Sequence, residues 1–319
     1  MLHFRLSRSR FAAALFALSL FPAAHAAEPG LYAEEENTWL DDSRQAVRDA
    51  SVWLASGINS WFGDRPFEDG GSVTNGRLKV STLWRRDDGV DVNVRFRARF
   101  DLPNLSDNAY FFFGRENKEE MLQDTPEAFS REQQLIHEEA RDDAFFAGVG
   151  TESRSGLGFR VGVRSSDWLY AQARYKHDWH MSLDDRLLFR ETVFASIKRG
   201  LGSTTTVDYE HDLTHTLMFR WLNRATITTK DHGWNWNTSL GLYQQFSHSR
   251  LLSLELLASG NTQNRVDVSE YGARLKWSQP IYRDWLFAEF VLGHFWPREE
   301  DALHRERAWA AGLGIEILF

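Results

Sequence analysis

Residues 90–101 read VDVNVRFRARFD, and apolar and polar side chains alternate through the whole stretch. The even-numbered positions form an apolar face, and the odd-numbered positions, three of them arginine, form a charged one. Successive side chains of a β-strand point to opposite faces. The stretch therefore predicts a strand that separates an apolar environment from a strongly polar one.

The same period of two residues recurs along the rest of the chain. It is clear in residues 157–164 (LGFRVGVR), 234–243 (WNWNTSLGLY) and 309–319 (WAAGLGIEILF). Short polar turns such as 86–89 (RDDG) and 183–186 (LDDR) separate the alternating segments. Many such segments joined by short turns predict an antiparallel β-meander over residues 76–319.

Two architectures alternate in this way, a soluble sandwich and a transmembrane barrel, and the sequence favours the barrel. The polar faces are rich in arginine, which suits a wet lumen. Trp and Tyr fall near many strand ends, as a membrane-interface girdle requires. We therefore predict an all-β fold, an antiparallel transmembrane β-barrel preceded by an N-terminal amphipathic helix.

The last strand carries a resemblance to a known class. Residues 312–319 (GLGIEILF) alternate and end on Phe319. In this the chain resembles Gram-negative outer-membrane β-barrel proteins, whose C-terminal strand ends in an aromatic residue. The resemblance implies that Phe319 is the assembly signal read by the barrel-assembly machinery, and that the protein resides in the cell outer membrane.

Several shorter runs are similar to those of a proteobacterial set of outer-membrane proteins of unknown activity. They are residues 220–223 (RWLN), 241–245 (GLYQQ), 269–272 (SEYG) and 282–287 (YRDWLF). This similarity implies a barrel and brings no activity or catalytic residue with it.

The number of strands follows from the turns. Bacterial single-chain barrels have even strand counts. Counting back from Phe319, we expect periplasmic turns near residues 282–283, 247–249, 213–215, 184–185, 152–155 and 103–107. External loops are then expected near 299–302, 261–265, 231–233, 199–202, 165–167, 115–143 and 87–88. This predicts 14 strands, with 12 if two short central segments merge.

The N-terminal part divides into a signal peptide, residues 1–26, and a periplasmic helix with its linker, residues 27–75. Met1–Arg10 holds three arginines, an apolar run follows, and Ala24-His25-Ala26 matches a signal-peptidase site. In the helix, expected over 37–62, an apolar residue recurs every seven positions. That stripe consists of Leu40, Val47, Leu54 and Trp61, flanked by Ala46, Ala50, Trp53 and Ile58.

Composition excludes several classes of protein. The 319 residues contain no Cys, which rules out disulfide scaffolds and thiol chemistry. A mean hydropathy of −0.46 rules out a bundle of transmembrane helices. The net charge of −8 argues against nucleic acid as a partner. The His177/His180 and His211/His215 pairs are more typical of solvated rim residues than of ligands, so we predict no metal and no cofactor.

The strongest functional pattern is a basic lumen. Taking the face opposite the apolar side chains gives seventeen bases against ten acids. Such a surplus in a pore attracts anions. The predicted pore-lining residues are Arg95, Arg97, Arg99, Arg160, Arg164, Arg174, Arg190, Arg220, Arg224 and Arg274.

One long acidic insertion interrupts the meander. Residues 115–143 carry ten acids and four bases. This loop could fold into the barrel mouth, bind divalent cations or remain in solvent. Charged loops most often remain in solvent.

Three functions fit these patterns. The favoured one is a passive diffusion channel with a weak preference for small anionic solutes. The alternative is a non-conducting structural barrel whose 37–62 helix docks a periplasmic partner. The third, a lipid-modifying hydrolase using Ser247 or Ser249 with His248, is disfavoured because adjacent strand residues point to opposite faces. The expected partners are outer-membrane lipid, the barrel-assembly machinery and small anionic solutes.

Overall fold

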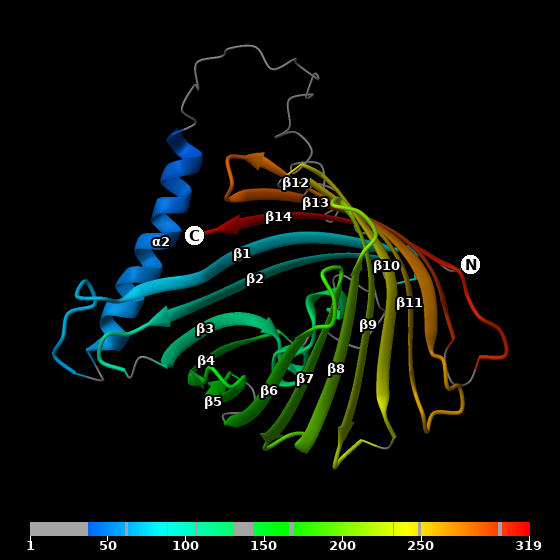
Figure 1. Cartoon of the computed structure of the whole chain (residues 1–319), viewed down its shortest axis with the longest axis horizontal. Coiled ribbons are helices and arrows are strands. Elements are labelled where there is room, and N and C mark those ends of the chain that lie inside the picture. The colour runs from blue at the N-terminus through cyan, green and yellow to red at the C-terminus, as the bar shows by residue number, and fades with distance from the viewer. Residues whose placement is uncertain are drawn as a thin grey trace, which may run out of the picture. The chain divides into compact units, whose positions relative to one another are not determined.

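The chain folds into one closed antiparallel β-barrel of 14 strands, as predicted (Figure 1). The computed structural model describes residues 38–60, 63–87, 89–105, 108–130, 143–165, 169–231, 233–247, 250–298 and 302–319. The predicted signal peptide, residues 1–26, lies outside the described residues. Each strand pairs with its sequence neighbours, and β1 pairs with β14 to close the ring.

The strand bounds match the alternating segments. They are β1 Ser72–Arg85, β2 Gly89–Asp101, β3 Ala109–Asn117, β4 Asp143–Glu152, β5 Leu157–Arg164, β6 Tyr170–His180, β7 Asp185–Ser196, β8 Gly200–Asp212, β9 Leu217–Thr228, β10 Asn235–Ser247, β11 Arg250–Asn261, β12 Glu270–Tyr282, β13 Leu286–Pro297 and β14 Ala308–Leu318. We call the end that holds the start of β1 and the end of β14 the terminal rim, and the opposite end the loop rim.

The first strand begins at Ser72, four residues earlier than the predicted barrel start at 76. Its register against β2 shifts between Thr74 and Arg77, and Asn75 has a positive φ of 55°. A β-bulge of this kind breaks the two-residue alternation. The alternating pattern therefore became readable only after the bulge.

Apolar side chains cover the outside of the barrel. Val92 is 50% exposed, Leu254 51% and Leu292 58%, each from a different part of the ring. Exposed apolar surface repeated on nearly every strand is far more than a soluble protein tolerates. It is the surface that a barrel presents to hydrocarbon.

Aromatic rings gather toward both rims. Near the loop rim Tyr271 stacks on Trp296, and Trp309 contacts His294. Toward the terminal rim Phe246 contacts Trp277. Amphipathic rings at two levels are the pattern expected at the two interfaces of a bilayer.

The predicted N-terminal helix is α2, Thr38–Asn59. Its buried residues Ala55 and Ile58 pack with Phe100 and Phe111, which lie on the apolar outer faces of β2 and β3. Arg44 donates from Nε to the carbonyl of Leu318 over 3.2 Å. Residues 42–59 therefore lie along the outside of the barrel wall at the terminal rim.

The buried face of α2 differs from the predicted stripe. Ser51, Ala55 and Ile58 are buried, whereas Trp53 is 78% exposed and Ala50 is also exposed. Ile58 was predicted correctly, and Trp61 and the side chain of Leu54 lie outside the described residues. Ser51 lies on the packed side and Trp53 on the exposed side, so hydrophobicity alone does not identify the packed side of this helix.

The C-terminal Phe319 closes the ring beside α2. Its N–H donates to the carbonyl of Gly76 over 3.1 Å, and its ring stacks on Phe96 with centroids 5.9 Å apart. None of the described helices has the length and apolarity needed to cross a membrane.

Candidate functional site

The ten predicted lumen arginines lie on the inward faces of their strands, and most of them contact carboxylates. The pairs are Arg95–Glu120, Arg97–Glu116, Arg99–Glu152, Arg174–Asp124, Arg190–Asp124, Arg220–Asp208 and Arg274–Glu255. Arg160 donates to Tyr110 Oη over 2.8 Å, Arg164 to the carbonyl of Lys118 over 3.0 Å, and Arg224 to Asn237 Oδ1 over 3.0 Å.

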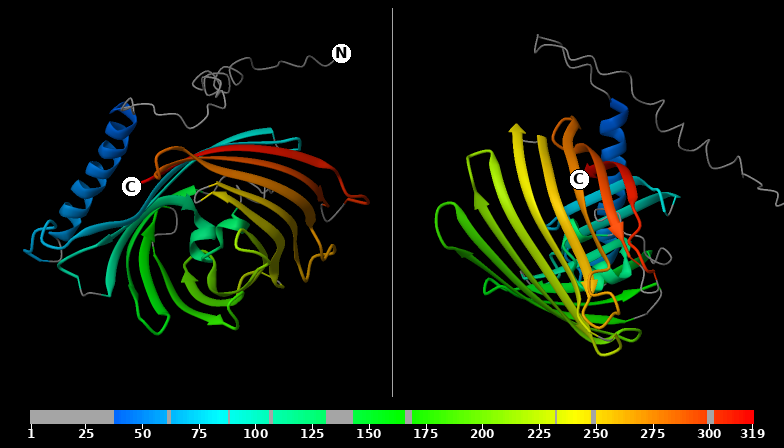
Figure 2. Two further views of the ribbon diagram at one scale, coloured as in Figure 1. Left: turned by 45° about the horizontal axis from the view of Figure 1, so that its top comes forward. Right: turned by 90° about the vertical axis from the view of Figure 1, so that its right-hand side faces the viewer.

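The acidic insertion does not stay outside the barrel. Residues 118–130, which we call the inner loop, turn into the lumen after β3, and the ring of strands surrounds them (left view of Figure 2). They form α3, Lys118–Leu122, and a 3-10 turn, η1, Glu127–Phe129. Asn117 caps α3 by accepting from the backbone N–H groups of Glu119 and Glu120. The rest of the insertion, 131–142, lies outside the described residues.

Two apolar patches inside the lumen support the inner loop. Met121 and Leu122 pack against one of them, formed by Tyr110, Phe112, Phe146, Tyr170 and Phe194. Phe129 packs against the other, formed by Leu222, Leu257, Val291, Phe295 and Ala310. Burial of these side chains favours the docked position of the loop.

Polar contacts anchor the inner loop to strands all around the ring. Its anchors come from β1, β2, β5, β6, β7, β9 and β12. They are Arg77, Lys79, Arg95, Arg164, Gln172, Arg174, Arg190, Arg224 and Arg274. Because strands on opposite sides of the ring hold it, the inner loop crosses the lumen.

Asp124 is the most heavily engaged acid of the inner loop. Its carboxylate lies 3.2 Å from Arg174 Nη1 and 3.3 Å from Arg190 Nε. Burial alone would raise the pKa of Asp124, but the charges of Arg190 and Arg174 outweigh it and lower the pKa to about 2. Since a free Asp has a pKa of about 3.9, this contact stabilises the folded loop above that pH and is lost as the pH falls through about 2.

Glu127 joins the other end of the inner loop to β1. Its carboxylate accepts from Arg77 Nη1 over 2.9 Å and lies 3.9 Å from Lys79 Nζ. Burial favours the neutral acid, but the charges of Arg77 and Lys79 prevail and hold the pKa of Glu127 below its ordinary value. Both anchoring acids are therefore ionised at neutral pH.

Six carboxylates of the lumen are not among the ten acids predicted from strand alternation. Glu116 and Glu152 lie on the inward faces of β3 and β4, and the inner loop adds Glu119, Glu120, Asp124 and Glu127. These six acids offset most of the predicted surplus of seven bases. The alternation Tyr110, Phe112, Gly114 could have placed Glu116, but no local pattern places the loop acids.

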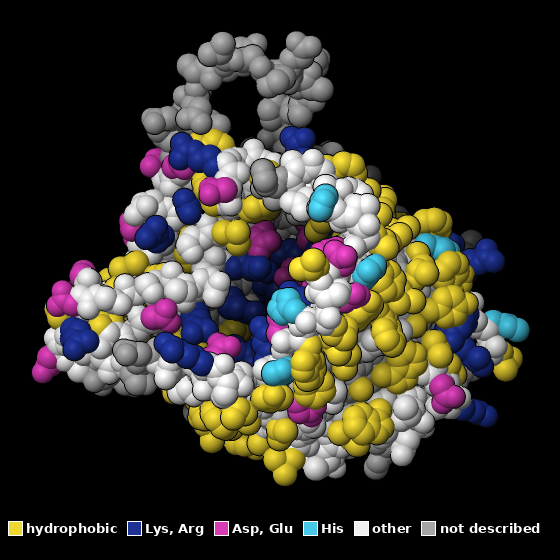
Figure 3. All heavy atoms as spheres, viewed as in Figure 1, with side chains coloured by type: hydrophobic (Ala, Val, Ile, Leu, Met, Phe, Trp, Pro, Cys, Tyr) yellow, Lys and Arg dark blue, Asp and Glu magenta, His cyan; other side chains and the backbone are white. Residues whose placement is uncertain are grey.

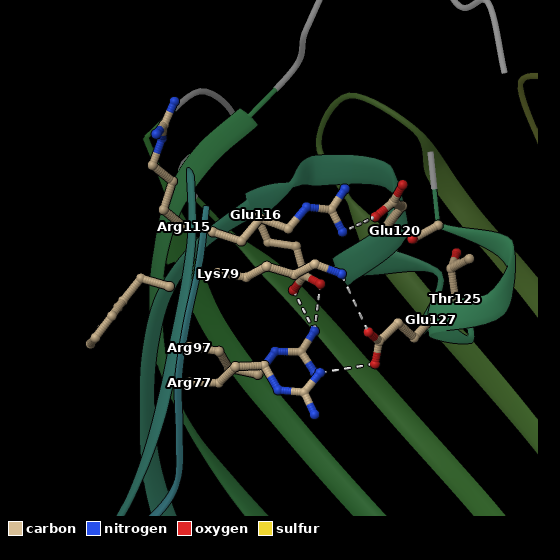
Figure 4. Close-up of a pocket in the computed structure, with 11 residues that line it drawn as sticks. Arg77, Lys79, Arg97, Arg115, Glu116, Glu120, Thr125 and Glu127 are labelled. Atoms are coloured by element: carbon tan, nitrogen blue, oxygen red, sulfur yellow. Dashed lines mark hydrogen bonds and ion pairs between the residues drawn. The ribbon is translucent and has the colours of Figure 1, made fainter. Parts of the chain in front are cut away.

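The space beside the inner loop remains basic. A cavity of about 80 Å³ is lined by five bases, Arg77, Lys79, Arg95, Arg97 and Arg115, and by three acids, Glu116, Glu120 and Glu127. In Figure 4 the side chains of Arg77, Lys79 and Arg97 converge on Glu116 and Glu127, and Arg115 points away from them. A second, smaller cavity has Arg160 and Arg174 opposite Asp124.

The molecular surface agrees with this distribution. Figure 3 shows a hollow in which Lys and Arg side chains gather, beside a broad apolar surface. A concave region with one predominant sign of charge raises the local concentration of the opposite ion.

The structure describes only one of the three residues of the disfavoured hydrolase prediction. Ser247 ends β10, and His248 and Ser249 lie outside the described residues. Elsewhere His211 Nδ1 lies 2.9 Å from Asp185 Oδ1, and the same carboxylate accepts from Ser182 over 2.6 Å. The serine thus bonds to the acid and not to the histidine, unlike a nucleophile–base pair.

A closed antiparallel barrel with an apolar exterior and a charged interior defines the class: this is a β-barrel of the outer-membrane type. No family model and no curated protein sequence matches the chain.

Several solved structures are similar to this chain. The anion-selective porin from Comamonas acidovorans covers 78% of this chain and 100% of its own, with 12% identity and a TM-score of 0.46. The match to OmpT, an outer membrane protein of Vibrio cholerae, covers 79% of this chain and 98% of OmpT, with 10% identity and a TM-score of 0.42. The match to the KdgM porin covers 76% of this chain and 99% of the porin, with 7% identity and a TM-score of 0.39.

Proposed function

We propose that the protein is an outer-membrane diffusion channel with a weak preference for small anionic solutes. The observation that carries the proposal is the basic lining of the space beside the inner loop, where bases outnumber acids in both polar cavities. A solute crossing the barrel passes the inner loop, because the loop is anchored on opposite sides of the ring. Arg side chains bind carboxylate and phosphate groups in a bidentate manner, which favours anions at this level.

The test is swelling of liposomes that contain the refolded protein. We expect faster swelling in a small dicarboxylate than in a neutral solute of the same size. The double variant Arg97→Gln/Arg160→Gln should lose most of this difference, because it removes one base from each cavity.

Arg154→Gln is the matched control, since it makes the same charge change at an exposed turn between β4 and β5. Liposomes that contain this variant should swell at the same rates as liposomes with the unmodified protein. Equal rates for the anionic and the neutral solute in the unmodified protein would contradict the anion preference, and the absence of swelling would contradict the channel.

A second candidate is a non-conducting structural barrel, and the firm anchoring of the inner loop favours it. In this case liposomes with the protein should not swell in any solute. The suggested docking of a periplasmic partner by the 37–62 helix would then use surface other than Ala55 and Ile58, because the barrel wall covers these two residues.

A further inference from the structure

One carboxylate lies on the apolar outer face of the barrel, away from both rims. Glu191 is in the middle of β7, a strand of 12 residues, and it shares the outer face with Phe189 and Val193, of which Val193 is 48% exposed. The other acids on the outer faces of the described strands, Asp143 and Asp185, are the first residues of β4 and β7. Glu191 is therefore the acid of the described wall that lies deepest in the apolar band.

Two hydroxyl groups contact Glu191 but do not neutralise its charge. Ser203 of β8 donates to one carboxylate oxygen, and Thr205 donates to the other over 2.6 Å. No Lys, Arg or His of the described residues forms an ion pair with it. Ionisable side chains within a membrane are costly and ordinarily have a partner. A group supplied by another molecule would meet this need.

A hydrogen-bond donor lies on the same face, on β9. Asn223 is two positions beyond Trp221, which is 45% exposed, so both side chains are on the outer face. Asn223 Oδ1 accepts from Thr238 Oγ1 over 2.8 Å. The N–H groups of its side-chain amide have no partner among the described residues. Two strands separate this amide from Glu191 of the same chain.

Glu191 and Asn223 lie at about the same depth in the wall. The line of paired residues through Glu191 runs from Leu157, at the terminal-rim end of β5, to Trp236, at the loop-rim end of β10, and passes through Ala225 on β9. With strands about 4.8 Å apart and tilted by about 40°, this line rises about 6 Å toward the loop rim between β7 and β9. Asn223 lies two residues from Ala225 toward the terminal rim, which lowers it by about 5 Å at the same tilt.

Equal depth is the condition for a two-fold symmetric contact in a membrane. Copies of one barrel insert in the same orientation, so a two-fold axis between them runs along the membrane normal. Such an axis sets residue i of one copy against residue j of the other, and j against i. An axis midway between Glu191 and Asn223 passes β8 between Thr205 and Val207. It places each carboxylate opposite the amide of the second copy.

Small side chains surround these two residues on the outer face. They are Ala173, Ala195, Ser203, Thr205 and Ala225, on β6 to β9. On β11 the same face carries Leu254 and Leu256, which are 51% and 58% exposed. Small side chains allow two membrane-embedded surfaces to approach closely. The wall around Glu191 is thus suited to contact with a second protein surface.

We propose that the outer face of β7–β9 is the contact surface of a homodimer in the membrane. Two equivalent hydrogen bonds join the copies, each donated by Asn223 Nδ2 of one copy to the Glu191 carboxylate of the other. This surface lies outside the lumen, so the proposal does not depend on the channel.

Energy transfer between labelled copies in liposomes tests the proposal. The chain has no Cys, so His215→Cys in the exposed turn between β8 and β9 provides a single labelling site. Donor-labelled and acceptor-labelled copies at high dilution in lipid should show transfer several-fold above that of randomly placed molecules. An excess of unlabelled protein should remove it. Glu191→Leu and Asn223→Leu should each reduce the transfer to the random level.

Thr82→Leu is the matched control, because it replaces a polar residue by leucine on the outer face of β1, seven strands away from β8. It should leave the transfer unchanged. Full transfer in Glu191→Leu, or transfer at the random level in the unmodified protein, would overturn the proposal.

Mixing the two variants distinguishes a direct contact from a change in the fold. A pair of identical variants keeps neither hydrogen bond, whereas one Glu191→Leu copy and one Asn223→Leu copy together keep one of the two. Donor-labelled Glu191→Leu mixed with acceptor-labelled Asn223→Leu should therefore recover part of the transfer. Circular dichroism checks that each variant is folded. Mixed variants that transfer no better than either variant alone would contradict the reciprocal contact.

Discussion

Replacing the inner loop, residues 118–130, with a flexible Gly-Ser segment of equal length should raise single-channel conductance several-fold. The folded loop crosses the lumen and is held from seven strands, so its removal opens the part of the lumen that the loop occupies. It also removes Glu119, Glu120, Asp124 and Glu127 and leaves their basic partners in place, so preference for anions should increase. Planar-bilayer recordings of the refolded variant measure both effects.

A second variant with only two substitutions tests the same prediction if the Gly-Ser replacement fails to fold. Asp124→Asn/Glu127→Gln keeps the chain length but removes the two acids that hold the loop to Arg174, Arg190 and Arg77. Its single-channel conductance should lie between that of the unmodified protein and that of the Gly-Ser replacement. Glu306→Gln, at an exposed position near the loop rim, serves as the control for charge. Conductance unchanged in the folded replacement would show that the inner loop is not the constriction.

Glu255→Ala should destabilise the barrel by about 3–5 kcal/mol, the usual effect of removing one partner of a buried ion pair. The side chains of Arg274 and Glu255 are only 1% and 2% exposed, and they contact each other directly. Ser239 and Ser253 also donate to Glu255, over 3.2 Å and 2.9 Å. The variant leaves a buried guanidinium without its carboxylate. Urea titration followed by tryptophan fluorescence measures the free energy of unfolding.

Two further variants separate burial from charge. Glu255→Met/Arg274→Met should recover most of the lost stability, because an apolar pair fills the space without a buried charge. Asp178→Ala, which breaks an exposed pair with Arg186 at the terminal rim, should have a much smaller effect because water screens that pair. A loss in Glu255→Ala no larger than that in Asp178→Ala would contradict a structural role for the buried pair.

The strands and turns were predictable because their signal is local. A barrel wall has one apolar and one wet side, so alternation such as that of Val92, Asn93 and Val94 reports both the strand and its orientation. The same alternation places the ten predicted lumen arginines on the face opposite the apolar side chains. The bulge at Asn75 shifted the predicted start of β1, because it interrupts the period on which the prediction depends.

The inner loop could not be predicted in this way. Its position depends on contacts distant in sequence, such as that of Asp124 with Arg190, 66 residues away. Residues 118–130 have no strand period, and a charged loop is ordinarily expected in solvent. The basic strands that receive the loop were visible in the sequence, but nothing local pairs them with it.

The reversal potential of the refolded, unmodified protein in a planar bilayer, under a gradient of KCl, tests the channel most directly. The basic cavities beside the inner loop predict channels whose reversal potential has the sign of chloride permeating faster than potassium. The preference should weaken as salt concentration rises, since ions screen the arginines. Absence of channels, or a reversal potential of the opposite sign, would contradict the account.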